Sequence, residues 1–84
     1  MRAVDDPTPI YTAVLQKLQI WGPLPESDIT RMLNTFQLVT NDYREMEESG
    51  YILLTFSGDE YILEMTDLGR IFLEREEQRA PKDR

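Results

Sequence analysis

The period of the apolar residues changes at Gly50, and this change constrains the fold more than any other feature of the chain. Before Gly50, apolar residues recur every three or four positions, which is the period of amphipathic helices. After it, residues 51–55 and 60–65 are rich in aromatic and β-branched side chains and flank a turn that contains Gly58, which predicts a β-hairpin. The chain is therefore expected to be mainly α-helical with one hairpin, an α+β fold.

Three helices are expected before the hairpin. The first begins at Thr8, whose hydroxyl can cap a free amide, with Pro9 in the first turn, and it ends before Gly22. Residues 21–27 form a turn, because they contain two prolines and a glycine, and a short second helix follows. The third helix spans about residues 38–49.

Local residues also predict how these elements end and begin. In the third helix, Val39, Tyr43 and Met46 share the inward face, and Gly50 supplies the left-handed cap that ends the helix. Thr66 is expected to cap a fourth helix after the hairpin. The expected order is thus three helices, two strands and a fourth helix.

The ends of the chain carry charge without an apolar period. Residues 1–7 are expected to form a flexible arm, residues 8–76 one folded domain, and residues 77–84 a charged, frayed tail. Fraying is expected to begin in the segment EREEQRAPKDR, which starts at Glu74 and contains as many acidic as basic residues. The excess of acidic residues therefore belongs to the folded part of the chain.

Composition excludes several classes of function. The 84 residues include no cysteine and no histidine, so a disulfide framework, a thiolate site, an imidazole ligand and a histidine base are all absent. Adjacent acids such as Glu47 and Glu48 diverge on a helix instead of converging on a substrate. We expect no enzymatic activity, no cofactor and no metal site. No apolar run is long enough to span a membrane, and a cytoplasmic location is expected.

Three motifs occur in the order and spacing of a known fold. They are PLPESDITRML (residues 23–33), MEESGYI (from Met46) and EMTDLGRIFLE (residues 64–74). Together they resemble the second helix, the end of the recognition helix and the last strand with the final helix of MarR-type and PadR-type winged helix-turn-helix regulators. The last motif is also similar to small haloarchaeal phage-repressor-like proteins. The resemblance covers roughly residues 8–76 and implies a prokaryotic, archaeal or viral transcriptional regulator that binds double-stranded DNA.

The resemblance also implies which residues contact DNA. The third helix would enter the major groove, and the positions that match its reading face are occupied by Gln37, Thr40, Asn41 and Arg44. Amide and guanidinium groups can bond bidentately to adenine and guanine, respectively. Arg31 on the second helix is expected to contact phosphate, as is Tyr11 on the first helix. The alternative is that these are ordinary polar residues on a solvated helix face.

The charge pattern argues against DNA binding. The formal net charge is −7, and the third helix holds Asp42, Glu45, Glu47 and Glu48 against Arg44 alone, a local balance of −3. The hairpin tip, residues 57–60, contains no lysine or arginine. The alternative function is an acidic protein-protein interaction module, an adaptor or anti-regulator that does not bind DNA.

Two surfaces are expected to bind a partner or form a homodimer. If the core face of the hairpin holds Ile52, Leu54, Leu63 and Met65, the opposite face exposes a different set of residues. The residues predicted on that face are Tyr51, Leu53 and Ile62, with cover by the first helix, Trp21 or the arm as the alternative. The fourth helix carries the successive residues Ile71, Phe72 and Leu73, more than one helix face can bury, although Leu73 could simply be exposed.

Overall fold

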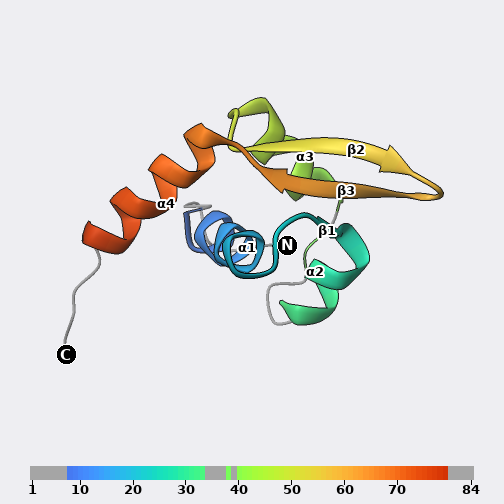
Figure 1. Ribbon diagram of the computed structural model, residues 1–84, viewed down its shortest axis with the longest axis horizontal. Helices are drawn as coiled ribbons and strands as arrows, with labels where there is room; N and C mark the ends of the chain where they lie inside the picture. Colours follow the sequence, from blue (N-terminus) through green and yellow to red (C-terminus); the bar gives the residue numbers. More distant parts are fainter. Residues whose placement is uncertain (1–7, 34–37, 39, 80–84) are drawn as a thin grey trace.

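The computed structural model describes residues 8–33, 38 and 40–79. Within these residues the chain forms four helices and a three-stranded antiparallel sheet, an α+β arrangement (Figure 1). The elements in chain order are α1 (Thr8–Trp21), β1 (Leu24–Pro25), α2 (Glu26–Met32), α3 (Thr40–Glu48), β2 (Ile52–Ser57), β3 (Glu60–Met65) and α4 (Asp67–Arg79). The sequence-based predictions of four helices and a hairpin are confirmed.

The sheet has the strand order β1-β3-β2, and β1 was not predicted from the sequence. In β1, Leu24 pairs with Leu63 and Pro25 with Ile62, whereas the sequence predicted only a turn at residues 21–27. A proline is tolerated here because β1 is an edge strand and its missing N–H breaks no internal ladder. This short strand ties the start of α2 to the hairpin.

Helix α1 provides the centre of the core. Ile10, Val14, Leu15 and Leu18 are buried on one side of α1, as their helical spacing predicts. The helix packs against β3 and α4, while α2 contacts β3 and α3 contacts β2 (Figure 1). The other buried hydrophobic residues of the described ranges are Ile29, Leu38, which precedes α3, and Tyr43, Met46, Ile52, Leu63 and Leu73.

The predicted cap at the end of α3 is confirmed. Gly50 has a φ of +88°, in the left-handed region that a glycine adopts without strain. Its N–H donates to the carbonyl oxygen of Glu47 at 2.9 Å, and the N–H of Tyr51 donates to that of Met46 at 3.0 Å. This pair of bonds is the Schellman motif, which satisfies the last helical carbonyls and turns the chain into β2.

Thr66 caps α4, as predicted, and also binds the end of α3. Its hydroxyl accepts a hydrogen bond from the N–H of Gly69 at 3.0 Å and donates one to the carbonyl oxygen of Gly50 at 2.6 Å. Its own N–H donates to the carbonyl oxygen of Tyr51 at 3.1 Å. One residue therefore fixes the start of α4 on the turn that follows α3.

Helix α4 is longer than predicted. The sequence predicted fraying from Glu74 and a tail over residues 77–84, but α4 continues to Arg79. Arg79 forms an ion pair with Glu76 at 3.4 Å, one turn apart, which supports the last helical turn. Residues 1–7 and 80–84, predicted to be an arm and a tail, lie outside the described residues.

An aromatic cluster joins α1 to α4. The rings of Tyr51 and Phe72 are stacked with centroids 4.4 Å apart, and Tyr11 meets both edge-on at 5.8 and 6.2 Å. The prediction that Tyr51 is exposed is therefore wrong: it precedes β2 and is half-buried beneath α4. Leu73 is fully buried, so the expectation that it lies on an outer surface is also wrong.

Candidate functional site

A part-buried hydrogen bond joins α2 to α3. The hydroxyl groups of Tyr43 on α3 and Thr30 on α2 are 2.8 Å apart, and the Tyr43 side chain is buried. Burial raises the pKa of Tyr43, and the hydrogen bond with Thr30 opposes this rise only in part. The neutral phenol thus fixes the orientation of α3 relative to α2.

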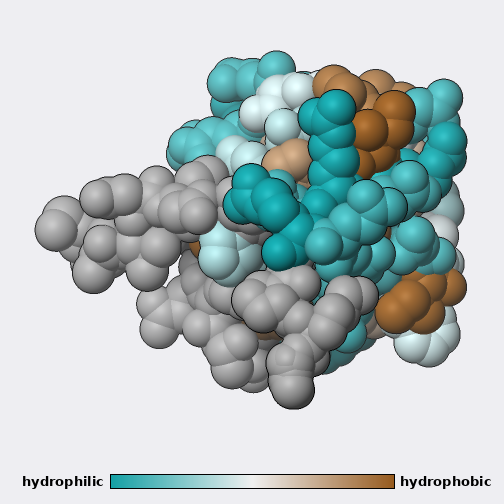
Figure 2. Space-filling view, turned by 90° about the vertical axis from the view of Figure 1, so that its left-hand side faces the viewer, coloured by the Kyte–Doolittle hydropathy of each residue, from teal (hydrophilic) through white to brown (hydrophobic). Residues whose placement is uncertain are grey.

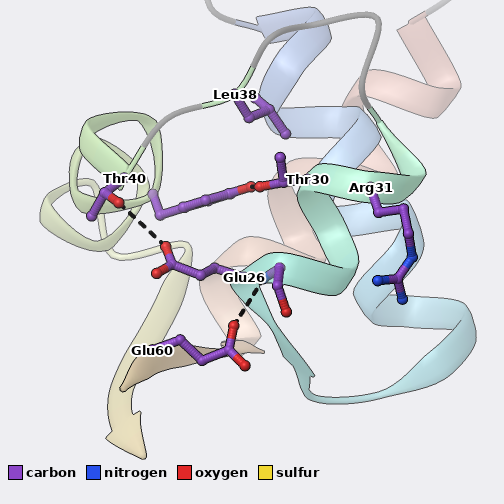
Figure 3. A pocket seen from close by; sticks show the side chains of 8 residues that line it. Glu26, Thr30, Arg31, Leu38, Thr40 and Glu60 are labelled. Carbon is purple, nitrogen blue, oxygen red and sulfur yellow. Dashed lines mark hydrogen bonds between the residues drawn. The ribbon is translucent and has the colours of Figure 1, made fainter. Parts of the chain in front are cut away.

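The first residues of α2 and α3 meet beside the hairpin around an open depression of about 550 Å³ (Figure 3). Thr40, at the start of α3, donates from its hydroxyl to Glu26 at 3.4 Å, and the backbone N–H of Ser27 donates to Glu60 of β3 at 3.2 Å. Carboxylates near helix N-termini interact favourably with the helix dipole. The residues that line this depression are Glu26, Ser27, Thr30, Arg31, Leu38, Thr40, Tyr43 and Glu60.

The outer face of α3 carries three of the four residues predicted to read DNA bases. Thr40, Asn41 and Arg44 are all exposed on this helix. The Asn41 amide donates to the carboxylate of Glu45, one turn later, at 3.1 Å. Gln37, the fourth predicted residue, lies outside the described residues. The described part of the face therefore offers a hydroxyl, an amide and a guanidinium along one side of α3.

Burial of Asp42 changes the charge of this face. The sequence predicted a balance of −3 for the third helix, with Asp42 among its acids, but only 4% of Asp42 is exposed. Glu45, Glu47 and Glu48 are exposed together with Arg44, so the described solvent side of α3 has a formal charge of −2. The surface that would meet DNA is acidic, but less so than the sequence indicated.

The two residues predicted to contact phosphate differ in whether their side chains are free to reach it. Arg31 is exposed at the end of α2 and forms an ion pair with Asp28 at 2.6 Å. Such an exposed pair contributes little stability, so Arg31 can exchange Asp28 for a phosphate at small cost. Tyr11 belongs to the aromatic cluster, where burial, and then the charge of Glu45, raises its pKa. Its ring is held by packing, which favours a structural role.

A second depression, of about 210 Å³, lies between α3 and the hairpin. Its lining consists of Arg44, Glu47, Glu48, Leu54 and Tyr61. The sequence did not predict this site, because the first strand of the hairpin was expected to end at Thr55. Phe56 continues β2 and lies directly opposite Tyr61. Their rings meet edge-on at 5.1 Å. Continuing the alternation of β2 by two residues would have put Phe56 on the same face as Leu54.

The residues predicted to form a partner or dimer surface are only partly exposed. Leu53 on β2 and Ile71 on α4 are exposed, whereas Ile62 and Phe72 are half-buried. Leu68 is exposed one turn before Ile71 on the outer side of α4. Figure 2 looks onto the side of the molecule where α4 lies and shows separate hydrophobic groups within a mostly hydrophilic surface.

No group of three or more acidic side chains in residues 8–33, 38 and 40–79 is placed to hold a metal ion. No helix in the same ranges has the length and apolar character needed to cross a membrane.

Comparison of the chain with models of known protein families, with curated protein sequences and with solved structures found no match.

Proposed function

We propose that the chain is a winged helix-turn-helix domain. The order of its elements supports this: two helices, α2 and α3, are held together by the bond between Tyr43 and Thr30, and a hairpin follows directly after α3. The short strand β1 lies between α1 and α2 in the chain. It pairs with β3 of the hairpin and so completes the sheet. The motifs of the sequence agree with this arrangement.

We further propose that the domain is a sequence-specific transcriptional regulator that binds double-stranded DNA through α3. The observation that carries this proposal is the row of exposed Thr40, Asn41 and Arg44 on the outer side of the helix. Arg44 can bond bidentately to guanine and Asn41 to adenine, if Asn41 exchanges its bond with Glu45 for one with the base. Arg31 would contact the phosphate backbone, and Gln37 is predicted to extend the reading face.

A homodimer would place two copies of α3 on successive turns of DNA. The outer side of α4 supports this part of the proposal, because Ile71 is 46% exposed and Leu68 lies one turn before it with similar exposure. Two apolar residues one turn apart form a small apolar stripe on an otherwise charged helix. Light scattering over a range of protein concentrations tests the dimer, and Ile71→Asp should shift the protein to the monomer.

Fluorescence anisotropy with labelled duplex DNA tests the DNA-binding proposal directly. Binding is expected to weaken as the salt concentration rises, and Arg44→Ala is expected to weaken it about fivefold or more. Arg75→Ala is the matched control, because it removes the same charge from the exposed side of α4. Equal effects of the two substitutions would show that Arg44 makes no specific contact. Absence of binding at micromolar protein and low salt would refute DNA binding.

The acidic side of α3 favours a second candidate function, binding to a protein. Glu45, Glu47 and Glu48 repel phosphate, whereas they would attract a partner with basic side chains. On this alternative the domain is an adaptor or anti-regulator that does not bind DNA. The same anisotropy titration separates the two candidates, because the second predicts no DNA binding at any salt concentration.

A further inference from the structure

The depression between α3 and the hairpin has two chemically different sides. The hairpin side is apolar and aromatic: Leu54 and Tyr61 line it, and Phe56 packs edge-on against Tyr61 while 61% of it stays exposed. The α3 side carries the carboxylates of Glu47 and Glu48. An apolar and aromatic side opposite a side with carboxylates matches the two parts of an arginine side chain, which combines an aliphatic stem with a planar cation.

Among the residues that the structure describes, neither carboxylate of this depression forms an ion pair. Arg44 lines the same depression, but among the described residues it forms no ion pair within 4.0 Å with either carboxylate. Glu47 accepts a hydrogen bond from the backbone N–H of Leu54 at 3.4 Å, which orients it toward the hairpin. Glu48 forms no ion pair among these residues and is exposed. Glu48 is therefore the carboxylate best placed to receive a cation from outside.

We propose that this depression binds an arginine side chain presented by a partner protein. The stem of the arginine would lie on Phe56 and Tyr61, and its guanidinium would meet Glu48. The volume of about 210 Å³ is below the usual range for small-molecule pockets, so it fits one side chain better than a free ligand. The proposal rests on one part of the second candidate function, that the acidic side of α3 binds a protein, and it does not require that DNA binding be absent.

The test uses a fluorescein-labelled peptide, three Gly-Arg-Gly units in series, in an anisotropy titration with the full chain at low salt. A peptide with glutamine in place of arginine is the probe control. Glu48→Gln and Phe56→Ser are each expected to weaken binding about threefold or more. Neither change is expected to impair folding, because Phe56 is exposed and a carboxylate at a helix C-terminus is unfavourable. Far-UV circular dichroism verifies this.

Matched control variants separate a specific site from general attraction. Glu77→Gln removes the same charge from α4, and Trp21→Ser removes an aromatic side chain that is 63% exposed on α1. Both should leave the affinity unchanged. Equal weakening by Glu48→Gln and Glu77→Gln would overturn the proposal, because it would show attraction to net charge alone. Absence of binding at millimolar peptide would also overturn it, whatever the outcome of the DNA titration.

A second copy of the chain is the competing occupant. Three results together would show that the depression is a self-association surface and that the proposal is wrong. In these results the wild-type protein dimerises in light scattering, Phe56→Ser abolishes the dimer, and the arginine peptide does not bind. If the peptide binds to monomeric protein with the expected dependence on Glu48, the proposal is supported.

Discussion

Replacing Gly69 with alanine tests how closely α4 packs against the rest of the molecule. Gly69 is buried, and a Cβ atom added there would lie 3.0 Å from the carbonyl carbon of Tyr51, closer still to its oxygen, and 3.2 Å from the Leu15 side chain. Backbone atoms cannot move aside as a flexible side chain can. The same carbonyl oxygen accepts the N–H of Thr66, so a shift of Tyr51 also strains that bond.

The change that Gly69→Ala is expected to make in the free energy of unfolding is the sum of opposing contributions. Alanine favours a helix over glycine by about 1 kcal/mol, whereas overpacking a core costs about 1–3 kcal/mol and a lost hydrogen bond about 1 kcal/mol. Because the added Cβ atom clashes with backbone atoms, the cost of overpacking lies at the upper end of its range, about 3 kcal/mol. The net expectation is a loss of about 2 to 3 kcal/mol, and each kcal/mol lowers the Tm of a chain of this size by about 4–8 °C.

Urea and thermal unfolding, followed by far-UV circular dichroism, measure this loss. Glu74→Ala is the control, because it places alanine at an exposed position of the same helix and should change the stability by less than about 0.5 kcal/mol. A Gly69→Ala protein as stable as the wild type, or more stable, would refute the close contact between α4 and Tyr51.

Three further predictions concern hydrogen bonds and pH. Thr66→Val keeps the shape but leaves the Gly50 carbonyl and the Gly69 N–H without their partner, and urea unfolding should show a loss of about 2 kcal/mol. Tyr43→Phe removes the bond to Thr30 and should cost about 1 kcal/mol in the same assay. Burial raises the pKa of Tyr43 above its unfolded value of 10.0, so stability is complete below pH 10 and falls as the pH rises further. Tyr43→Phe should make that fall shallower in unfolding measured at several pH values.

Local rules predicted the elements whose cause lies within a few residues. Gly50 and Thr66 marked the end of α3 and the start of α4 because caps depend on neighbouring backbone groups. The position of β1 could not be predicted in this way, because two residues become a strand only through pairing with Leu63 and Ile62. The last turn of α4 was missed for a different reason, since alternating charges look the same in a frayed tail and in a helix with ion pairs.

The surroundings of single side chains were harder to predict than the elements. Asp42 was counted as surface charge, because most aspartates are exposed, but it is buried in the first turn of α3. Tyr51 was assigned to the outer side by strand alternation, although it precedes β2 and the stacking partner that covers it, Phe72, comes from a distant helix. The contacts of Glu26 with Thr40 and of Glu60 with Ser27 likewise join separate elements. Long-range contacts, which sequence periodicity does not contain, decide all of these.

The two halves of the exposed side of α3 carry chemically different side chains. Its N-terminal half presents Thr40 and Asn41, which suit base edges, and its C-terminal half presents Glu47 and Glu48 beside the aromatic pair of the hairpin. Arg44 lies between the halves and affects both. Its charge would attract DNA on the proposed function, whereas in the depression it would repel an incoming arginine. Removal of Arg44 should therefore act with opposite sign on the two proposed partners, weakening DNA binding and strengthening binding of the arginine peptide. Arg75→Ala makes the same change in net charge on α4 and measures the part of each effect that net charge alone produces, so the effect of Arg44→Ala should be the larger for both partners.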